Sequence, residues 1–319
     1  MYNLNMILTI IPNLVTIESD DEQIISMYNN YFQFFGNSKE QEKFHFKIVK
    51  KDIVFFSKIY NESHYQTNNC GVNKNHYFWY KRSFLNFNTN LIFDYKNNIF
   101  YYNSDSIFEF IFSRVQIGEF YSTRNLILQL INTKIFLSGY TSFSGLSFLE
   151  SNNKVFVAIA PRHNGKTSFM QEIMKTKMKK FISDNTVVLN LDEKKVYPTI
   201  PSWNMSKNNS KSIFSFLINH PSKIQEKSIE FNKLFCIINN HDKKPLGHKS
   251  YFQPHDFYFN SSIEPISNYA VKDFIMLTQS GKLVFDKINK SINYLEKMSE
   301  NKSLSIIEIT NYKFGNIKL

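Results

Sequence analysis

The sequence predicts a two-part α/β protein, and three observations carry this prediction. Residues 1–133 are rich in short runs of aromatic and β-branched residues, the side chains that favour strands. From residue 134 onward, strand-type runs alternate with helix-type runs, which is the order of an α/β sheet. In this second part, the apolar run 154–160 leads directly into a loop and a helix. We therefore expect a β-rich α+β domain over residues 1–133 and an α/β core over residues 134–319.

The first part is expected to contain several strands and then a helical segment. Its strand-type segments are 6–15, 43–56, 75–87 and 90–102. The last of these has the turn sequence KNN between two apolar runs and should fold as a β-hairpin. Residues 104–134 carry apolar side chains at helical spacing, and a break near Gly118 should divide them into two helices.

The second part is expected to alternate between strands and helices. Its strands should be 134–140, 145–150, 154–160, 181–191, 231–239 and 304–310. Its helices should be 167–180, 212–219 and 284–299. Turns are expected at 151–153 and 192–195, and the segment 196–201 should be extended.

Composition narrows the class of protein. Of the 319 residues, 42% are hydrophobic and 20% are charged, a globular composition that can fill a sizeable core. The net charge is +11, but no DNA- or RNA-binding motif accompanies it, so we do not expect a nucleic-acid partner. Cys70 and Cys236 form no CxxC pair, which fits a reducing cytoplasm. No apolar run approaches the roughly 18 residues of a membrane span.

The segment APRHNGKT, Ala160–Thr167, nearly fits the phosphate-binding loop G-x-x-x-x-G-K-[ST], with alanine in place of the first glycine. N–H groups at a helix start favour phosphate oxygens, and Gly165 permits a close backbone approach. Lys166 would reach the β- and γ-phosphates of a nucleotide, and Thr167 would bind Mg²⁺. The residues expected to contact the nucleotide are Ala160, Pro161, Arg162, His163, Asn164, Gly165, Lys166, Thr167 and Ser168.

After the predicted helix, the chain continues with FISDNTVVLNL (Phe181–Leu191), a turn and VYPTIP. Over residues 140–203, this succession resembles the HPr kinase/phosphorylase-like P-loop kinases, which include relatives found beside biosynthetic genes for modified peptides. The resemblance implies an α/β kinase core of the phosphoenolpyruvate carboxykinase-like type. It places Ser183, Asp184 and Asn185 where the family has Ser-Asp-Asp.

The resemblance also implies an activity and roles for individual residues. Asp184 would take the proton from an acceptor hydroxyl, acting with Lys166. Thr167, Asp184 and Asn185 would hold Mg²⁺, although an asparagine cannot supply negative charge. The expected reaction is the ATP-dependent phosphorylation of a serine in a peptide or protein acceptor, with ATP and Mg²⁺ as cofactors. In the segment before the loop, where relatives often have a histidine, this chain has Ser142 and Ser144.

Other functions stay open at this point. The acceptor could be a small hydroxylated metabolite rather than a peptide. The loop is close to the form GPRxxGKT, which also occurs in regulatory ATPases that act as nucleotide-dependent switches. A third alternative is a module that binds a peptide without catalysis. The sequence is also compatible with a homo-oligomer.

Two further groups of residues have a structural interpretation that we favour. His241, His248 and His255 are spaced by seven in a segment that contains proline and glycine. We expect solvated loop histidines there, rather than a metal site or a substrate-binding loop. Trp79 and its aromatic neighbours could stack on nucleic-acid bases, but such residues more often fill the core beside a strand.

Overall fold

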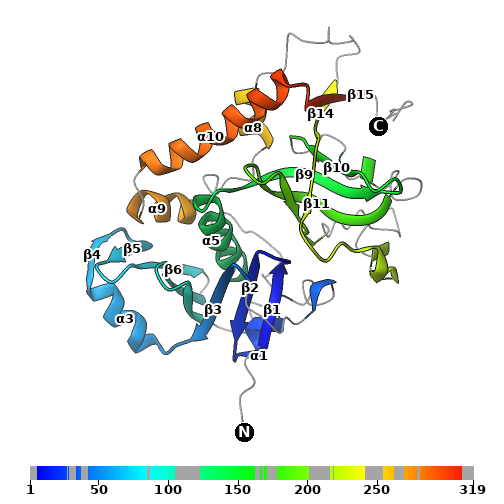
Figure 1. Cartoon of the computed structure of the whole chain (residues 1–319). Coiled ribbons are helices and arrows are strands. Elements are labelled where there is room, and N and C mark those ends of the chain that lie inside the picture. Colours follow the sequence, from blue (N-terminus) through cyan, green and yellow to red (C-terminus); the bar gives the residue numbers. More distant parts are fainter. Residues whose placement is uncertain are drawn as a thin grey trace. The chain divides into compact units, whose positions relative to one another are not determined.

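The structure is a computed structural model of the whole chain (Figure 1). It describes residues 6–26, 28, 34–36, 42–84, 87–104, 123–161, 166, 169–170, 178–200, 216–217, 219–240, 254–261, 269–278 and 281–310. The fold is mixed α/β, with two large sheets that each contain parallel and antiparallel strand pairs.

The chain forms two compact units. The first comprises Met1–Ile10, Leu14–Leu137 and Pro265–Phe285. The second comprises Ile11–Asn13, Ser138–Glu264 and Asp286–Leu319. The first unit therefore combines a long segment that ends at Leu137 with a short segment, Pro265–Phe285, from the C-terminal half of the chain.

The first unit is built on an eight-stranded sheet. Its strands are β1 (Met6–Ile11), β2 (Val15–Ser19), β3 (Phe44–Lys50), β4 (Ser63–Gln66), β5 (Cys70–Asn73), β6 (Tyr77–Phe84), β7 (Phe87–Asp94) and β8 (Ile99–Ser104). Their order is β1-β2-β3-β8-β7-β6-β5-β4, with β2, β3 and β8 parallel and β8 to β4 antiparallel. The predicted hairpin is confirmed as β7 and β8. Asp94 stabilises its turn, because Oδ1 accepts from the backbone N–H groups of Lys96 and Asn97 at 3.2 and 3.0 Å.

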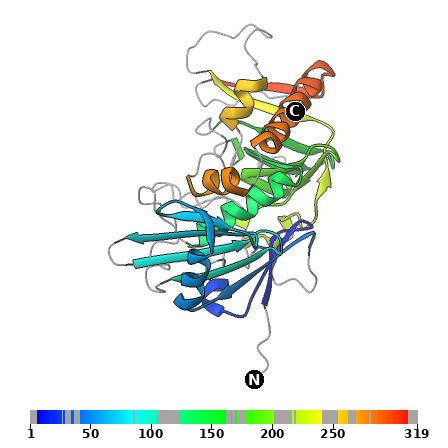
Figure 2. The same ribbon diagram turned by 90° about the vertical axis from the view of Figure 1, so that its left-hand side faces the viewer.

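Helices cover both faces of this sheet. They are α1 (Glu22–Ser26), α3 (Ile53–Asn61), α5 (Thr123–Leu137) and α9 (Tyr269–Thr278). Figure 2 shows α3 on one side of the sheet and α5 and α9 on the other. Tyr60 of α3 packs on Trp79, with ring centroids 4.7 Å apart. On the opposite face, the ring centroid of Phe274 of α9 lies 5.1 Å from that of Phe78 and 5.6 Å from that of Phe93. The alternation of aromatic residues along β6 and β7 therefore fills two separate aromatic layers.

The second unit is built on a seven-stranded sheet. Its strands are β9 (Tyr140–Glu150), β10 (Val155–Ile159), β11 (Met178–Asn190), β12 (Lys195–Tyr197), β13 (Ile229–Glu230), β14 (Leu234–Asn240) and β15 (Leu304–Thr310). Their order is β13-β12-β11-β9-β10-β14-β15. Strands β10, β14 and β15 are parallel to one another, whereas β9 is antiparallel to both of its neighbours. Within these bounds, the expected strands 145–150, 154–160, 181–191, 231–239 and 304–310 are confirmed.

Two helices and a short 3-10 turn with described bounds lie in the second unit, although residues 281–285 at the start of α10 belong to the first unit. They are α8 (Pro254–Ser261), α10 (Gly281–Glu300), which confirms the expected helix 284–299, and η1 (Pro221–Lys223). Tyr258 of α8 packs edge-on against Phe143, with centroids 5.7 Å apart. Ser291 of α10 shares a hydrogen bond of 3.0 Å with Thr141, and both side chains are buried. Since Phe143 and Thr141 alternate with Ser142 and Ser144 along β9, these two helices cover one face of the sheet.

The expected strand 134–140 is wrong in its first half. Residues 134–137 form the last turn of α5, and β9 begins at Tyr140. Gly139, with a φ of +100°, separates the two elements. The side chains of Ile135 and Phe136 are buried on the helix, and a short apolar run of this kind fits a buried helix as well as a strand.

Helix and strand boundaries differ from expectation at two further places. Residues 53–56 begin α3 instead of extending a strand, because Asp52 caps the helix by accepting from Phe55 N at 2.9 Å. Residues 178–180 belong to β11 instead of the helix expected over 167–180. Lys180 pairs with Leu149, so the ladder with the long strand β9 overrides the helical propensity of this lysine-rich segment.

Some expectations fall partly outside the described residues. Of the segment 104–134, residues 105–122 lie outside them, and the remainder forms α5. Of the helix expected over 212–219, only residues 216, 217 and 219 are described, and they are helical. The strand expected over 6–15 is divided into β1 and β2 by a turn in which Asn13 has a φ of 61°.

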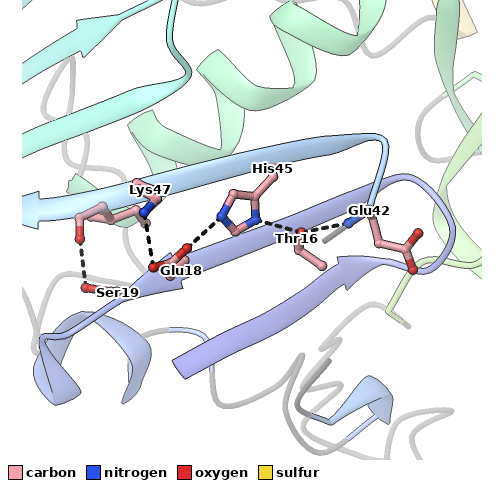
Figure 3. Close-up of polar contacts among 7 residues, drawn as sticks. Thr16, Glu18, Ser19, Glu42, His45 and Lys47 are labelled. Carbon is pink, nitrogen blue, oxygen red and sulfur yellow. Dashed lines mark hydrogen bonds and ion pairs between the residues drawn. The ribbon is translucent and has the colours of Figure 1, made fainter. Parts of the chain in front are cut away.

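A polar network ties the parallel strands β2 and β3 together (Figure 3). Glu18 Oε2 lies 2.8 Å from His45 Nε2, and its Oε1 lies 3.3 Å from Lys47 Nζ. His45 Nδ1 lies 3.1 Å from Thr16 Oγ1, which also accepts from the backbone N–H of Glu42 at 3.2 Å. Nε2 must donate to the carboxylate, so in the neutral ring Nδ1 accepts from the threonine hydroxyl. Thr16 is fully buried, so the network holds strand register and offers no hydroxyl to a substrate.

The carboxylate of Glu18 should stabilise the fold in a pH-dependent way. Burial raises its pKa, but the hydrogen bonds from His45 and Lys47 outweigh burial and hold the pKa below its ordinary value. We expect Glu18→Gln to lower the free energy of unfolding at pH 7 by roughly 1–3 kcal/mol. A lowered folded pKa gives stability that is present above the unfolded value of about 4.3 and is lost as pH falls through the folded value. The loss should therefore shrink below about pH 4, as measured by urea unfolding across this range.

Glu193→Gln is the matched control for this prediction. Glu193 pairs with Lys195 at 2.9 Å, but the two side chains are 46% and 36% exposed, so solvent screens the pair and its replacement should leave stability nearly unchanged at every pH. Equal stability of Glu18→Gln and wild type at pH 7 would contradict the role given to the network.

Candidate functional site

The predicted phosphate loop lies where β10 ends. Ala160 continues the ladder beyond the strand, because its N–H donates to Ser144 O at 2.8 Å. Lys166 is helical and buried, and its Nζ donates to the backbone oxygen of Pro161 at 2.7 Å. The ammonium group thus lies against the beginning of the loop. Of the other predicted loop residues, Arg162, His163, Asn164, Gly165, Thr167 and Ser168 lie outside the described residues.

An aromatic stack holds the segment after the loop against one face of the sheet. Phe169, three residues after Lys166, packs on Phe156 of β10 at 5.9 Å between centroids. Phe156 in turn stacks with Phe148 of β9 at 4.8 Å and with Phe235 of β14 at 4.5 Å. Four aromatic rings from separate segments therefore fix the face on which Lys166 lies.

Strand register brings Asp184 to the same face. Leu146 of β9 pairs with Ala158 of β10 on one side and with Asp184 of β11 on the other. Residues paired across a sheet project from the same face, and two strand spacings put the Cα atoms of Ala158 and Asp184 about 10 Å apart. Asp184 is buried, with 1% of its surface exposed. The sequence predicts a partnership between the loop and Asp184, and the sheet places β10, which leads into the loop, and β11, which carries Asp184, on either side of β9.

The outer edge of β11 is covered at this point by the segment after β12. Thr199 N donates to Ile182 O at 3.0 Å, and Thr199 Oγ1 donates to Thr186 O at 2.7 Å. The two acceptors, Ile182 and Thr186, lie on either side of Asp184 in the strand. Thr199 therefore fixes the backbone of β11 around this carboxylate. On the opposite face, Ser183 and Ser147 share a buried hydrogen bond of 2.5 Å. Asp184 is therefore held in position from both sides of its strand.

Gly145 allows the three strands to approach as closely as they do. A Cβ at this position would lie 2.3 Å from the backbone oxygen of Ala158 and 2.9 Å from Val187 Cγ2. A side chain cannot be accommodated against a main-chain oxygen without moving β10 away from β9. This requirement was not predicted, because it depends on strand pairing rather than on the sequence around the glycine.

The groups at this site fit a phosphate better than they define a metal site. A buried ammonium that lies against the main chain just after β10 suits an anionic phosphate. Among the residues that the structure describes, no group of three or more His, Cys, Asp or Glu side chains could hold a metal. Three residues were predicted to bind magnesium. The structure describes both the backbone and the side chain of Asp184, but only the backbone of Asn185, which pairs with Gly145. Thr167 lies outside the described residues. A single carboxylate is compatible with Mg²⁺, which often binds through one or two carboxylates and substrate phosphates.

The remaining candidates from the sequence have structural positions. Trp79 is buried under α3, and its Nε1 donates to Ser63 Oγ at 2.6 Å, so the core interpretation is confirmed. His255 lies in the helix α8, where a loop was expected. His241 and His248 lie outside the described residues.

Comparison with protein-family models, with curated proteins and with solved structures finds no match for this chain. The resemblance to the HPr kinase/phosphorylase-like kinases therefore stays an interpretation of the segment 140–203. Among the helices that the structure describes, none is both long enough and apolar enough to cross a membrane.

Gly145→Ala should open the contact between β9 and β10. The added methyl meets a backbone oxygen, so we expect the free energy of unfolding to fall by roughly 1–3 kcal/mol or more, as in other overpacked cores. Urea denaturation followed by circular dichroism would measure the loss. The double variant Gly145→Ala/Val187→Ala should not recover stability, because it relieves only the side-chain contact. Full recovery would show that the carbonyl contact does not limit the approach of the strands.

Proposed function

We propose that the second unit binds ATP at the loop 160–168 and transfers its γ-phosphoryl group to a hydroxyl. The observation that carries the proposal is the pairing of Ala158 and Asp184 across Leu146, which gives the strand before the loop and the carboxylate one common face. Phosphoryl transfer needs orientation and charge stabilisation more than covalent help from the protein, and this face offers a cation and a base.

The residues would divide the work as follows. Lys166, the buried cation of the loop, would neutralise charge on the β- and γ-phosphates. Asp184 would accept the proton of the attacking hydroxyl, as a carboxylate at a rigid strand position can. Mg²⁺, held by Asp184 with Thr167, would supply further neutralisation of phosphate charge. The favoured acceptor is a serine of a peptide or protein, and a small hydroxylated metabolite is the alternative.

One observation bears on the alternative of a switch ATPase. In P-loop ATPases, a Walker-B aspartate helps to hold Mg²⁺. Here β14 is parallel to β10 and adjacent to it, and it ends in Asn239 and Asn240. The described part of β14, Leu234–Asn240, contains no Asp or Glu, whereas Asp184 on β11 is a buried carboxylate of the same sheet, and this supports the kinase proposal.

Substitution of Lys166 tests nucleotide binding. Lys166→Ala should weaken the binding of ATP–Mg²⁺ by at least about tenfold, because a charge-assisted contact to phosphate is lost. Isothermal titration calorimetry would measure the change. Lys179→Ala is the control, since Lys179 is an exposed lysine of the same unit whose Nζ contacts Asn153. Equal ATP affinity of Lys166→Ala and wild type would contradict the proposed site.

Substitution of Asp184 tests the transfer step. Asp184→Asn keeps the shape of the side chain, so ATP should still bind, whereas phosphoryl transfer should fall about 10²- to 10⁴-fold with loss of the base. Mass spectrometry of serine-containing peptides incubated with ATP would detect the gain of one phosphate. Asp192→Asn is the control, because Asp192 is an exposed carboxylate paired with Lys290. ATP hydrolysis at an unchanged rate in Asp184→Asn, with no phosphorylated acceptor, would favour the switch ATPase instead.

A further inference from the structure

The hydroxyl of Ser144 is a buried polar group whose position needs an explanation. The residue has 2% of its surface exposed, and no described residue offers its Oγ a hydrogen-bond partner. A buried hydroxyl without a partner is destabilising, and such groups are rare in folded proteins. A serine at this place in β9 is therefore poorly explained by packing, since alanine would fill nearly the same space.

Ser144 lies between the two functional elements of the site. Its backbone oxygen accepts from the N–H of Ala160, the first residue of the loop. On its other side it pairs with Thr186, two residues along β11 from Asp184. Because side chains two apart on a strand share a face, Ser144 projects from the same face as Leu146 and Asp184. Ser144 therefore lies on the strand between Ala160, where the loop begins, and β11, and it shares its face with Asp184.

We propose that Ser144 is a positioning residue that donates a hydrogen bond to a non-bridging oxygen of the γ-phosphate. The inference rests on the proposed function and extends it. In the reaction, the acceptor oxygen attacks the γ-phosphorus, the bond to the β–γ bridging oxygen breaks, the acceptor proton moves to Asp184, and ADP leaves. Ser144 exchanges no proton in this step. Its hydroxyl orients the γ-phosphoryl group and distinguishes a nucleoside triphosphate from a diphosphate.

The matched control lies on the same strand. Ser147 is as deeply buried as Ser144 but projects from the opposite face, where its Oγ is 2.5 Å from Ser183 Oγ. Ser147→Ala therefore removes a satisfied hydrogen bond remote from the proposed ligand, whereas Ser144→Ala removes a hydroxyl that has none in the described structure. If Ser147 is structural and Ser144 binds a ligand, Ser147→Ala should lower stability and Ser144→Ala should lower ligand affinity.

The experiment measures thermal stability and the affinity for two probes, a non-hydrolysable ATP analogue and ADP, each with Mg²⁺. Ser144→Ala should melt at or above the wild-type temperature and bind the ATP analogue about 10- to 100-fold more weakly, the range for a hydrogen bond to a charged group. Its affinity for ADP should be unchanged. Ser147→Ala should melt at a lower temperature and keep the wild-type ratio of the two affinities. If Ser144→Ala does not fold, Ser144→Cys, with a weak donor of similar size, should show the same selective loss.

Three results would overturn the inference. Wild-type affinity of Ser144→Ala for the ATP analogue would show that the hydroxyl contacts no phosphate. An equal loss of affinity for the analogue and ADP would place the effect away from the γ-phosphate. A lowered melting temperature of Ser144→Ala with unchanged binding would assign the hydroxyl a structural role. In all three cases wild type still binds ATP, whereas failure of wild type to bind either probe would refute the proposed function itself.

Discussion

The close antiparallel packing of β9 between β10 and β11 is the constraint on which the candidate site depends. Neither the loop nor Asp184 is near the other in sequence, and β9 is the strand that brings them to one face. That arrangement requires glycine at 145, where a Cβ would meet a main-chain oxygen. It also requires an alternation along β9, with Thr141 and Phe143 turned toward α10 and α8 and with Leu146 on the face of Asp184.

The first unit is also organised by strand pairing and by the alternation of side chains along its strands. Its sheet is covered on both faces, so aromatic side chains alternate along β6, β7 and β8 into two layers. Two of its buried carboxylates have structural partners: Asp94 closes a turn, and Glu18 with His45 holds two parallel strands in register. The candidate site lies in the second unit, where a buried hydroxyl and a buried carboxylate project from one face of the sheet.

Local sequence signals predicted the elements that obey local rules. Apolar runs identified β10, β14 and β15, and the KNN turn identified the β7–β8 hairpin. Errors arose where the deciding partner is remote: pairing with β9 extends β11 back to Met178, and burial keeps residues 134–137 helical. The loop and Asp184 were predicted from motif and resemblance. The roles of Gly145 and Thr199, and the burial of Ser144, required strand order, which no local pattern encodes.

The central claim is that a nucleotide binds at the loop and lies across the face shared with Asp184. Hydrogen–deuterium exchange with and without ATP–Mg²⁺ tests it most directly, because it reports on every backbone amide of the intact chain. The account predicts slower exchange in peptides that cover residues 158–177 and, to a smaller extent, 142–146 and 183–187, with no change in the peptides of β6 and β7. Protection that leaves 158–177 unchanged, or no protection at saturating ATP, would contradict it.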